Sequence, residues 1–210
     1  MTETEEGRSR FLGAIAAFSA ANAADPNTAR DGDSERPREL LDAERLAAWV
    51  ERLEPNASEA LRLAARCQHL RRWEVRRSDY ETGRIGYLKW RKALARFHAD
   101  RAAEVLRAVG YDAGTLERVR RINMKQDITE DRDVQTMEDA LCLSFLEYEL
   151  EEFAAKHPEE KTVDILFKTW NKMSARGRDA ALALQLSGRG AALLEKALAG
   201  AGGAESAGDA

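Results

Sequence analysis

The sequence has few of the features that mark secreted or membrane proteins. Only two of its 210 residues are cysteines, Cys67 and Cys142, and both lie in apolar, helix-like contexts. We therefore expect buried, reduced thiols rather than a disulfide or a metal pair. No apolar run approaches the roughly 18 to 20 residues that span a bilayer, and the acidic N-terminus is unlike a secretory signal or transit peptide. These absences predict a cytoplasmic protein without a membrane partner.

Signals for β-strands are equally scarce. β-branched residues are few, and no segment shows convincing alternation of apolar and polar residues, whereas apolar residues at helical spacing recur along the chain. The chain is predicted to be all-α, a single-domain bundle of about seven to nine helices over residues 8–199. Residues 1–7 and 200–210 are predicted to be disordered. We expect a helix from Ser58 to about Trp73, another from about Val134 to Lys156, and a polar loop over 31–36.

One segment is strongly basic although the chain carries a net charge of −4. Residues 62–101 contain 12 Lys/Arg against 4 Asp/Glu, interleaved with aromatic rings. Arginine beside aromatic rings suits planar or phosphorylated anions, through bidentate hydrogen bonds and stacking. The segment is too short, and the overall charge too negative, to favour nucleic acid. The predicted ligand-binding residues are Arg71, Arg72, Trp73, Arg77, Tyr80, Arg84, Tyr87, Lys89, Trp90 and Arg91.

Two of the three histidines, His69 and His98, flank this basic segment. Taken alone, each is explained as a helix-surface or core histidine whose nitrogen bonds a backbone carbonyl. His98 has the stronger case for function, because it follows the Arg/aromatic segment and opens an Ala-rich run that suits close packing. His157 precedes Pro158 at a predicted helix end, where a cation is favoured, and we assign it no function.

A pair of carboxylates, Glu138 and Asp139, lies early in an otherwise apolar predicted helix. They could simply stabilise the helix N-terminus. Asp139, however, is followed by Cys142 and Leu143 at helical spacing, which directs it inward, and a buried carboxylate needs a compensating partner. His69, His98 and Asp139 together supply three ligands for an open divalent metal site.

Several short motifs resemble a family whose activity is not established. The chain is similar to family forty-two-oh-two of the domains of unknown function from about Phe11 to Ala181. The segments that carry this resemblance are Ala64-Ala-Arg-Cys-Gln-His69, Gly86-Tyr-Leu-Lys-Trp-Arg91, Phe97-His98-Ala99, Val109-Gly-Tyr111 and Gln135-Thr-Met-Glu-Asp139, with Asp25-Pro26-Asn27 and Lys172-Met173-Ser174.

A fainter resemblance links the chain to HD-type metal-dependent phosphohydrolases, which are helical enzymes. The helix ending at His69, the helix carrying His98 and the helix carrying Asp139 resemble ligand helices of that family. This sequence departs from the pattern in two places: Leu70 follows His69 where the doublet would have Asp, and Asp42 stands where the first ligand would be His.

The resemblance implies an HD-like helix arrangement and a divalent metal that activates water and polarises a phosphoryl oxygen. We therefore expect hydrolysis of a small phosphorylated metabolite or nucleotide. The alternative is a non-catalytic helical protein that binds an anionic ligand or a partner protein through the Arg/aromatic pocket. A third interpretation needs no ligand. Residues 130–160 contain 11 Asp/Glu against 2 Lys/Arg, and these acids could simply neutralise the arginines.

Overall fold

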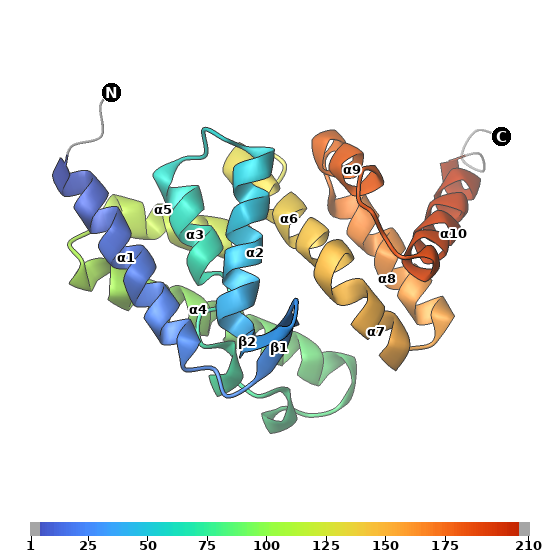
Figure 1. The fold of residues 1–210 in the computed structure, drawn as a ribbon, viewed down its shortest axis with the longest axis horizontal. Coiled ribbons are helices and arrows are strands. Elements are labelled where there is room, and N and C mark those ends of the chain that lie inside the picture. The colour runs from blue at the N-terminus through green and yellow to red at the C-terminus, as the bar shows by residue number, and fades with distance from the viewer. Residues whose placement is uncertain (1–4, 206–210) are drawn as a thin grey trace. The chain divides into compact units, whose positions relative to one another are not determined.

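The structure, a computed structural model, describes residues 5–205, and the side chains of residues 5–199. It forms two compact units, Met1–Met137 and Glu138–Ala210, here called unit 1 and unit 2. Helices dominate both units, and the strands in the described residues form one short hairpin (Figure 1). The all-α prediction is confirmed. None of the helices in residues 5–205 is long and apolar enough to cross a membrane.

Unit 1 is built around a short buried helix, α3 (Glu59–Cys67). Ser58 caps it by accepting a hydrogen bond from the backbone N–H of Leu61, at 3.1 Å. α3 packs against α1 (Glu5–Ala23), α2 (Arg38–Leu53) and α5 (Ala113–Asn123), and the first two lie beside it in Figure 1. Leu61, Leu63, Ala64, Ala65 and Cys67 are all fully buried, because neighbours surround the helix on several sides and alanine lets them approach closely.

The helix α3 ends at Cys67, six residues before the predicted end at Trp73. Arg71 adopts a left-handed conformation with φ of 55°, and its backbone N–H donates to Oδ1 of the buried Asn22, at 3.1 Å. Two 3-10 turns follow, η1 (Arg72–Glu74) and η2 (Arg77–Asp79). The end of α3 is therefore accompanied by a hydrogen bond to Asn22 in α1, which lies 49 residues earlier in the chain.

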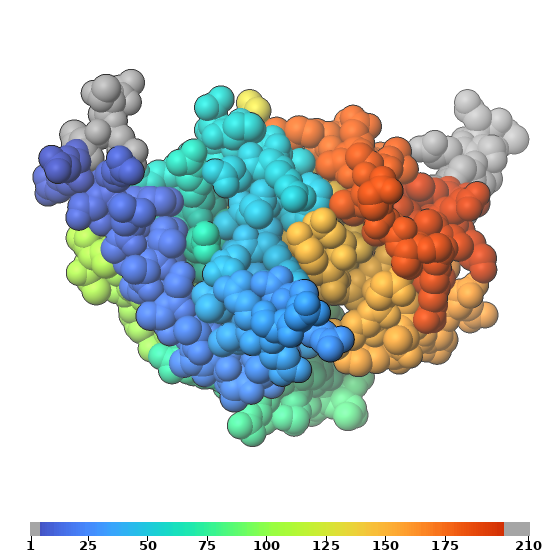
Figure 2. Space-filling model, in the orientation of Figure 1, coloured from blue at the N-terminus to red at the C-terminus, as the bar shows by residue number. Residues whose placement is uncertain are grey.

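The prediction that 31–36 is a loop was wrong. β1 (Thr28–Asp31) pairs antiparallel with β2 (Ser34–Pro37), with Thr28 opposite Pro37 and Asp31 opposite Ser34. Gly32 supplies the positive φ that this two-residue turn requires. The strands are only four residues long and mostly polar, so no alternating pattern marks them. The hairpin lies on the surface of the face shown in Figure 2.

The long helix α4 (Gly83–Ala108) packs against α1 and α5 in unit 1. Trp90, Leu94, His98, Ala102 and Leu106 are buried at spacings of four, so one stripe of the helix faces the interior. This stripe carries His98 into the core.

Unit 2 continues from the middle of α6 (Arg132–Ser144). A π-helical turn, η3 (Phe145–Glu149), separates α6 from α7 (Leu150–Lys156), so the single helix predicted over 134–156 is divided. α8 (Glu159–Lys172), α9 (Ala175–Leu182) and α10 (Gly188–Glu205) follow, and α10 packs against α7 and α8 (Figure 1).

The predicted disordered ends are described only in part. Glu5–Gly7 and residues 200–205 belong to helices, whereas residues 1–4 and 206–210 lie outside the described residues. The prediction of a single domain over 8–199 stays a prediction.

Candidate functional site

Arg72 is the centre of the candidate site, just after the turn that ends α3. Its Nε lies 3.8 Å from Oε1 of Glu39, a buried acid in the first turn of α2. Its guanidinium carbon lies 5.4 Å from the centroid of the Trp90 ring, within cation–π range. We call Glu39, His69, Arg72, Trp90 and His98 the Arg72 cluster.

His98 is buried in this cluster, with 3% of its surface exposed. Its Nδ1 lies 2.8 Å from the backbone carbonyl oxygen of Leu70. Because a carbonyl can only accept, Nδ1 carries the proton and donates it. Burial is the main cause that lowers the pKa of His98 to about 4; the Leu70 bond opposes this effect, and the charges of Arg72 and Arg91 add to it. His98 is therefore neutral at pH 7.

The ring of His69 lies beside that of His98, with centroids 5.9 Å apart. Burial holds the pKa of His69 well below its usual value, and the nearby charges of Arg72, Lys125 and Arg91 act in the same direction. The structure thus brings together the two histidines that the sequence singled out. Both are neutral bases in an electropositive setting.

Arg72 also acts on Asp42, which stands where the HD pattern has its first histidine. Burial raises the pKa of Asp42, and the charges of Arg38, Arg45 and Arg72 oppose that rise. The same guanidinium therefore influences Asp42, His69 and His98. The site can hold an anion near Arg72, and its neutral imidazoles can accept or relay a proton.

Most of the other predicted ligand-binding residues either bond to nearby residues of the basic segment or are exposed. Arg77 donates to the backbone carbonyls of Tyr80 and Glu81, at 3.0 and 2.9 Å, and so organises its own loop. Trp90 donates from Nε1 to the carbonyl of Val75, at 3.0 Å. Arg71 forms an ion pair with Glu74. Trp73 and Tyr80 are half-buried, whereas Arg84, Tyr87, Lys89 and Arg91 are exposed.

Asp139 lies in unit 2, where it is fully buried as its helical position predicts. Its carboxylate accepts hydrogen bonds from the backbone N–H of Ser174, at 2.8 Å, and from the Ser174 hydroxyl, at 2.5 Å. Ser174 in turn caps α9 through the N–H of Gly177. Asp139 therefore joins α6 to α9, and no feature of the sequence predicted Ser174 as its partner.

The described residues contain no group of three or more His, Cys, Asp or Glu placed to hold a metal ion. His69 and His98 are suitable neutral ligands, but no third ligand accompanies them among the described residues of unit 1. The metal site composed of His69, His98 and Asp139 stays a prediction.

The comparison with protein families identifies the chain. A family model described as a domain of unknown function (DUF4202) matches residues 13–194. The chain belongs to this family. No curated protein and no solved structure matches it. The DUF4202 match confirms the first resemblance and covers the Arg72 cluster and Asp139, whereas the likeness to HD-type enzymes stays a hypothesis.

In this DUF4202 protein, residues of both charged segments form ion pairs with residues of the same unit. In the basic segment, Lys89 pairs with Glu81 at 3.6 Å and Arg101 with Glu104 at 2.8 Å, in addition to the pairs of Arg71 and Arg72. In the acidic segment, the pairs are Glu138 with Lys172, Glu152 with Lys156, and Glu159 with Lys196. Local pairing therefore accounts for part of both charge excesses.

Sequence reasoning missed Glu39 and Asn22, which support the turn at Arg72. Asn22 donates from Nδ2 to the carbonyl of Glu39, at 3.3 Å, and Oδ2 of Asp25 accepts from the N–H of Glu39, at 3.0 Å. The one available signal was Asp25-Pro26-Asn27, a motif of the family resemblance. It marks the turn that brings α1 and α2 together.

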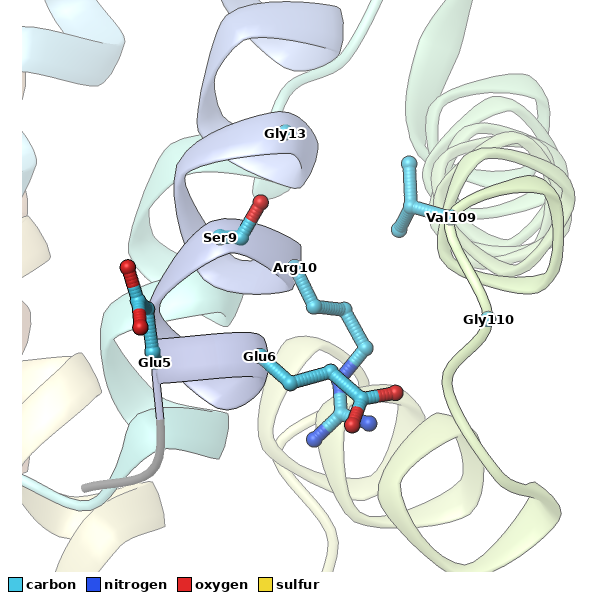
Figure 3. A pocket seen from close by; sticks show the side chains of 7 residues that line it. All are labelled: Glu5, Glu6, Ser9, Arg10, Gly13, Val109 and Gly110. Carbon is cyan, nitrogen blue, oxygen red and sulfur yellow. The ribbon is translucent and has the colours of Figure 1, made fainter.

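A separate hollow of about 720 Å³ lies between α1 and the end of α4 (Figure 3). Glu5, Glu6, Ser9, Arg10 and Val109 contribute to its lining. The Arg10 guanidinium is 4.6 Å from the centroid of the Tyr111 ring, so this cation already has a partner. With two acids beside it, the hollow is poorly suited to an anion.

Proposed function

We propose that this protein binds a small phosphorylated metabolite or nucleotide at the Arg72 cluster. The observation that carries the proposal is the convergence of positive charge on two neutral imidazoles. Arg72 and Arg91 lower the pKa of both His69 and His98, and Lys125 adds its charge at His69. A bound phosphate would relieve this crowding of basic groups.

The contacts of Arg72 are compatible with binding of a phosphate group. The separation of 3.8 Å between Arg72 Nε and Glu39 Oε1 is near the outer limit of an ion pair, and the Arg72 side chain is 33% exposed, so a ligand can reach the guanidinium from solvent. Guanidinium groups bind phosphate oxygens through two parallel hydrogen bonds. Arg91 is exposed, and its long side chain can provide a second cation.

Calorimetric titration with glycerol 3-phosphate and with AMP tests the proposal. We expect saturable binding to the wild-type protein, and at least about tenfold weaker binding to Arg72→Gln, because one bidentate charged contact is worth more than 1.4 kcal/mol. Lys92→Ala is the matched control, since Lys92 is an exposed cation of the same segment. Equal affinities for the two variants, or no binding to wild type, would refute the proposal.

A second candidate is metal-dependent phosphoester hydrolysis, favoured by the adjacent neutral imidazoles of His69 and His98. Their neutral state at pH 7 is the one that binds metal. A complete site needs at least one further ligand, and Asp139 is bonded to Ser174 in unit 2. Metal content after purification without chelator, in wild type and in the His69→Ala and Asp139→Ala variants, tests this candidate. Stoichiometric metal that both substitutions remove would support the enzyme.

A further inference from the structure

We infer that the ligand of the Arg72 cluster donates a hydrogen bond to Nε2 of His98. It is therefore a phosphate monoester that also carries a hydroxyl or amino group, rather than a simple alkyl phosphate. This inference rests on the proposed function and narrows its ligand class.

The hydrogen bond of His98 to Leu70 fixes the roles of both ring nitrogens. Nδ1 donates to the carbonyl oxygen at 2.8 Å, so Nε2 of the neutral ring is an acceptor. This atom is buried and has no hydrogen-bond partner among the described residues. A buried acceptor without a donor is destabilising, and such groups are rare in folded proteins. His98 thus presents an unmet requirement for a donor.

The neighbourhood of the turn at residues 67–70 contains further acceptors of this kind. Gln68 donates from Nε2 to the carbonyl of Asn123, at 3.4 Å, and Asn123 donates from Nδ2 to Sγ of Cys67, at 3.2 Å. Gln68 Oε1 and Asn123 Oδ1 are buried without hydrogen-bond donors in the part of the chain that the structure describes. Unmet acceptors therefore gather around the turn that presents His69 and Arg72.

A ligand with one negatively charged group and one hydrogen-bond donor would satisfy both the cation of Arg72 and the acceptor Nε2 of His98. Its phosphate would pair with Arg72 and Arg91, and a hydroxyl or amino group on the same molecule would donate to His98. The dianionic phosphate group of a monoester has acceptors only and cannot supply that hydrogen bond. His69 and Arg72 are half-buried, whereas Nε2 of His98 is closed to solvent, so the side chains beside Arg72 must move for the ligand to reach it.

Two probes of equal charge separate the contribution of the hydroxyl groups to binding from that of the phosphate. Glycerol 3-phosphate and n-propyl phosphate share a phosphate monoester and a three-carbon chain, and only the first carries hydroxyl groups. We expect the wild-type protein to bind glycerol 3-phosphate at least about fivefold more tightly than n-propyl phosphate. The difference is one hydrogen bond to a buried acceptor.

Two substitutions at His98 then assign the preference to Nε2. In His98→Asn, the amide nitrogen can replace Nδ1 and donate to Leu70, but nothing replaces Nε2. In His98→Gln, the longer amide can place its oxygen near the position of Nε2. We expect the Asn variant to bind the two probes with equal affinity, and the Gln variant to retain part of the preference.

The outcomes distinguish this inference from the proposed function. Equal affinity of the wild-type protein for the two probes would overturn the inference alone, and would fit a buried water at Nε2. A preference that persists in folded His98→Asn would also overturn it. If neither probe binds, the proposed function fails and the inference fails with it. Circular dichroism of both variants verifies that they fold.

Discussion

His98 in unit 1 and Asp139 in unit 2 are both buried polar groups, but their surroundings differ. Asp139 receives hydrogen bonds from the N–H and hydroxyl of Ser174. His98 has one partner, the Leu70 carbonyl, and its second nitrogen has none among the described residues. Burial alone does not distinguish a structural group from a binding group. Hydrogen bonds that the protein itself leaves unmade are the better indicator of a ligand.

The strongest test of the structural role of Asp139 is Gly177→Ala. A Cβ at this position would lie 2.6 Å from the carboxyl carbon of Asp139, so the alanine would push apart α6 and α9. We expect the free energy of unfolding to fall by about 2–4 kcal/mol, from overpacking and a weakened helix cap. Urea denaturation measures this change.

Gly188→Ala is its control, because a Cβ there would meet nothing within 4 Å. Its expected effect is within about 0.5 kcal/mol. Equal losses for the two variants would contradict the role assigned to Asp139.

Acidification tests whether His98, the buried polar group of unit 1, is held neutral in the folded protein. His98 titrates near 6.5 when unfolded, and burial lowers its folded-state pKa to about 4. Between these values the unfolded chain binds a proton that the folded chain does not, so stability falls as the pH falls. At about 1.4 kcal/mol per pH unit, His98 accounts for a loss of about 2–3 kcal/mol between pH 6.5 and 4.5.

His98→Asn cannot titrate, so the free energy of unfolding of this variant should fall less over the same range. Urea denaturation at pH 6.5 and 4.5 gives the difference between the two proteins. A pH dependence that is the same in wild type and variant would show that His98 is not held neutral in the folded state.

Removal of the partner of Asp139 should have a smaller effect than Gly177→Ala. Ser174→Ala deletes the hydroxyl that bonds Asp139 and caps α9, but it keeps the backbone N–H bond. We expect a loss of about 1–2 kcal/mol in the free energy of unfolding, with unchanged affinity for glycerol 3-phosphate. A tenfold loss of affinity in this variant would mean that Asp139 belongs to the binding site.

Thiol labelling gives the smallest expected signal. Unit 1 carries Cys67 and unit 2 carries Cys142, and both are buried. Burial raises the pKa of the Cys67 thiol to about 12, so almost no thiolate forms at pH 8. Mass spectrometry after brief exposure to iodoacetamide should find Cys67 unmodified until denaturant unfolds unit 1. Rapid modification of Cys67 in the native protein would contradict this closed interior.

The sequence predicted the features that depend on local spacing. The helical spacing of apolar residues along the chain correctly indicated an all-α fold, although it did not show that His98 lies on the buried stripe of α4. Asp139 was likewise expected to point inward, and it is fully buried. Such patterns are readable because the period of the helix alone decides which side chains share a face.

Features set by distant contacts could not be predicted. The end of α3 at Cys67 is accompanied by a bond from Arg71 to Asn22, 49 residues away, and Asp139 meets Ser174 across 35 residues. The hairpin over 28–37 has strands too short and polar to show a pattern. Spacing within one helix says nothing of which other helix supplies the partner, so Ser174 could not be predicted from the sequence as the partner of Asp139.

Long-range ¹H–¹⁵N NMR of the histidine rings tests the central claim most directly. The chain has three histidines, so every ring can be assigned, and the exposed ring nitrogen of His157 beside Lys161 serves as the internal reference. At pH 7 we predict a neutral His98 with its proton on Nδ1, and a shift of its Nε2 resonance on saturation with glycerol 3-phosphate. A proton on Nε2 in the free protein, or ring resonances of His69 and His98 that do not move with the ligand, would contradict the account.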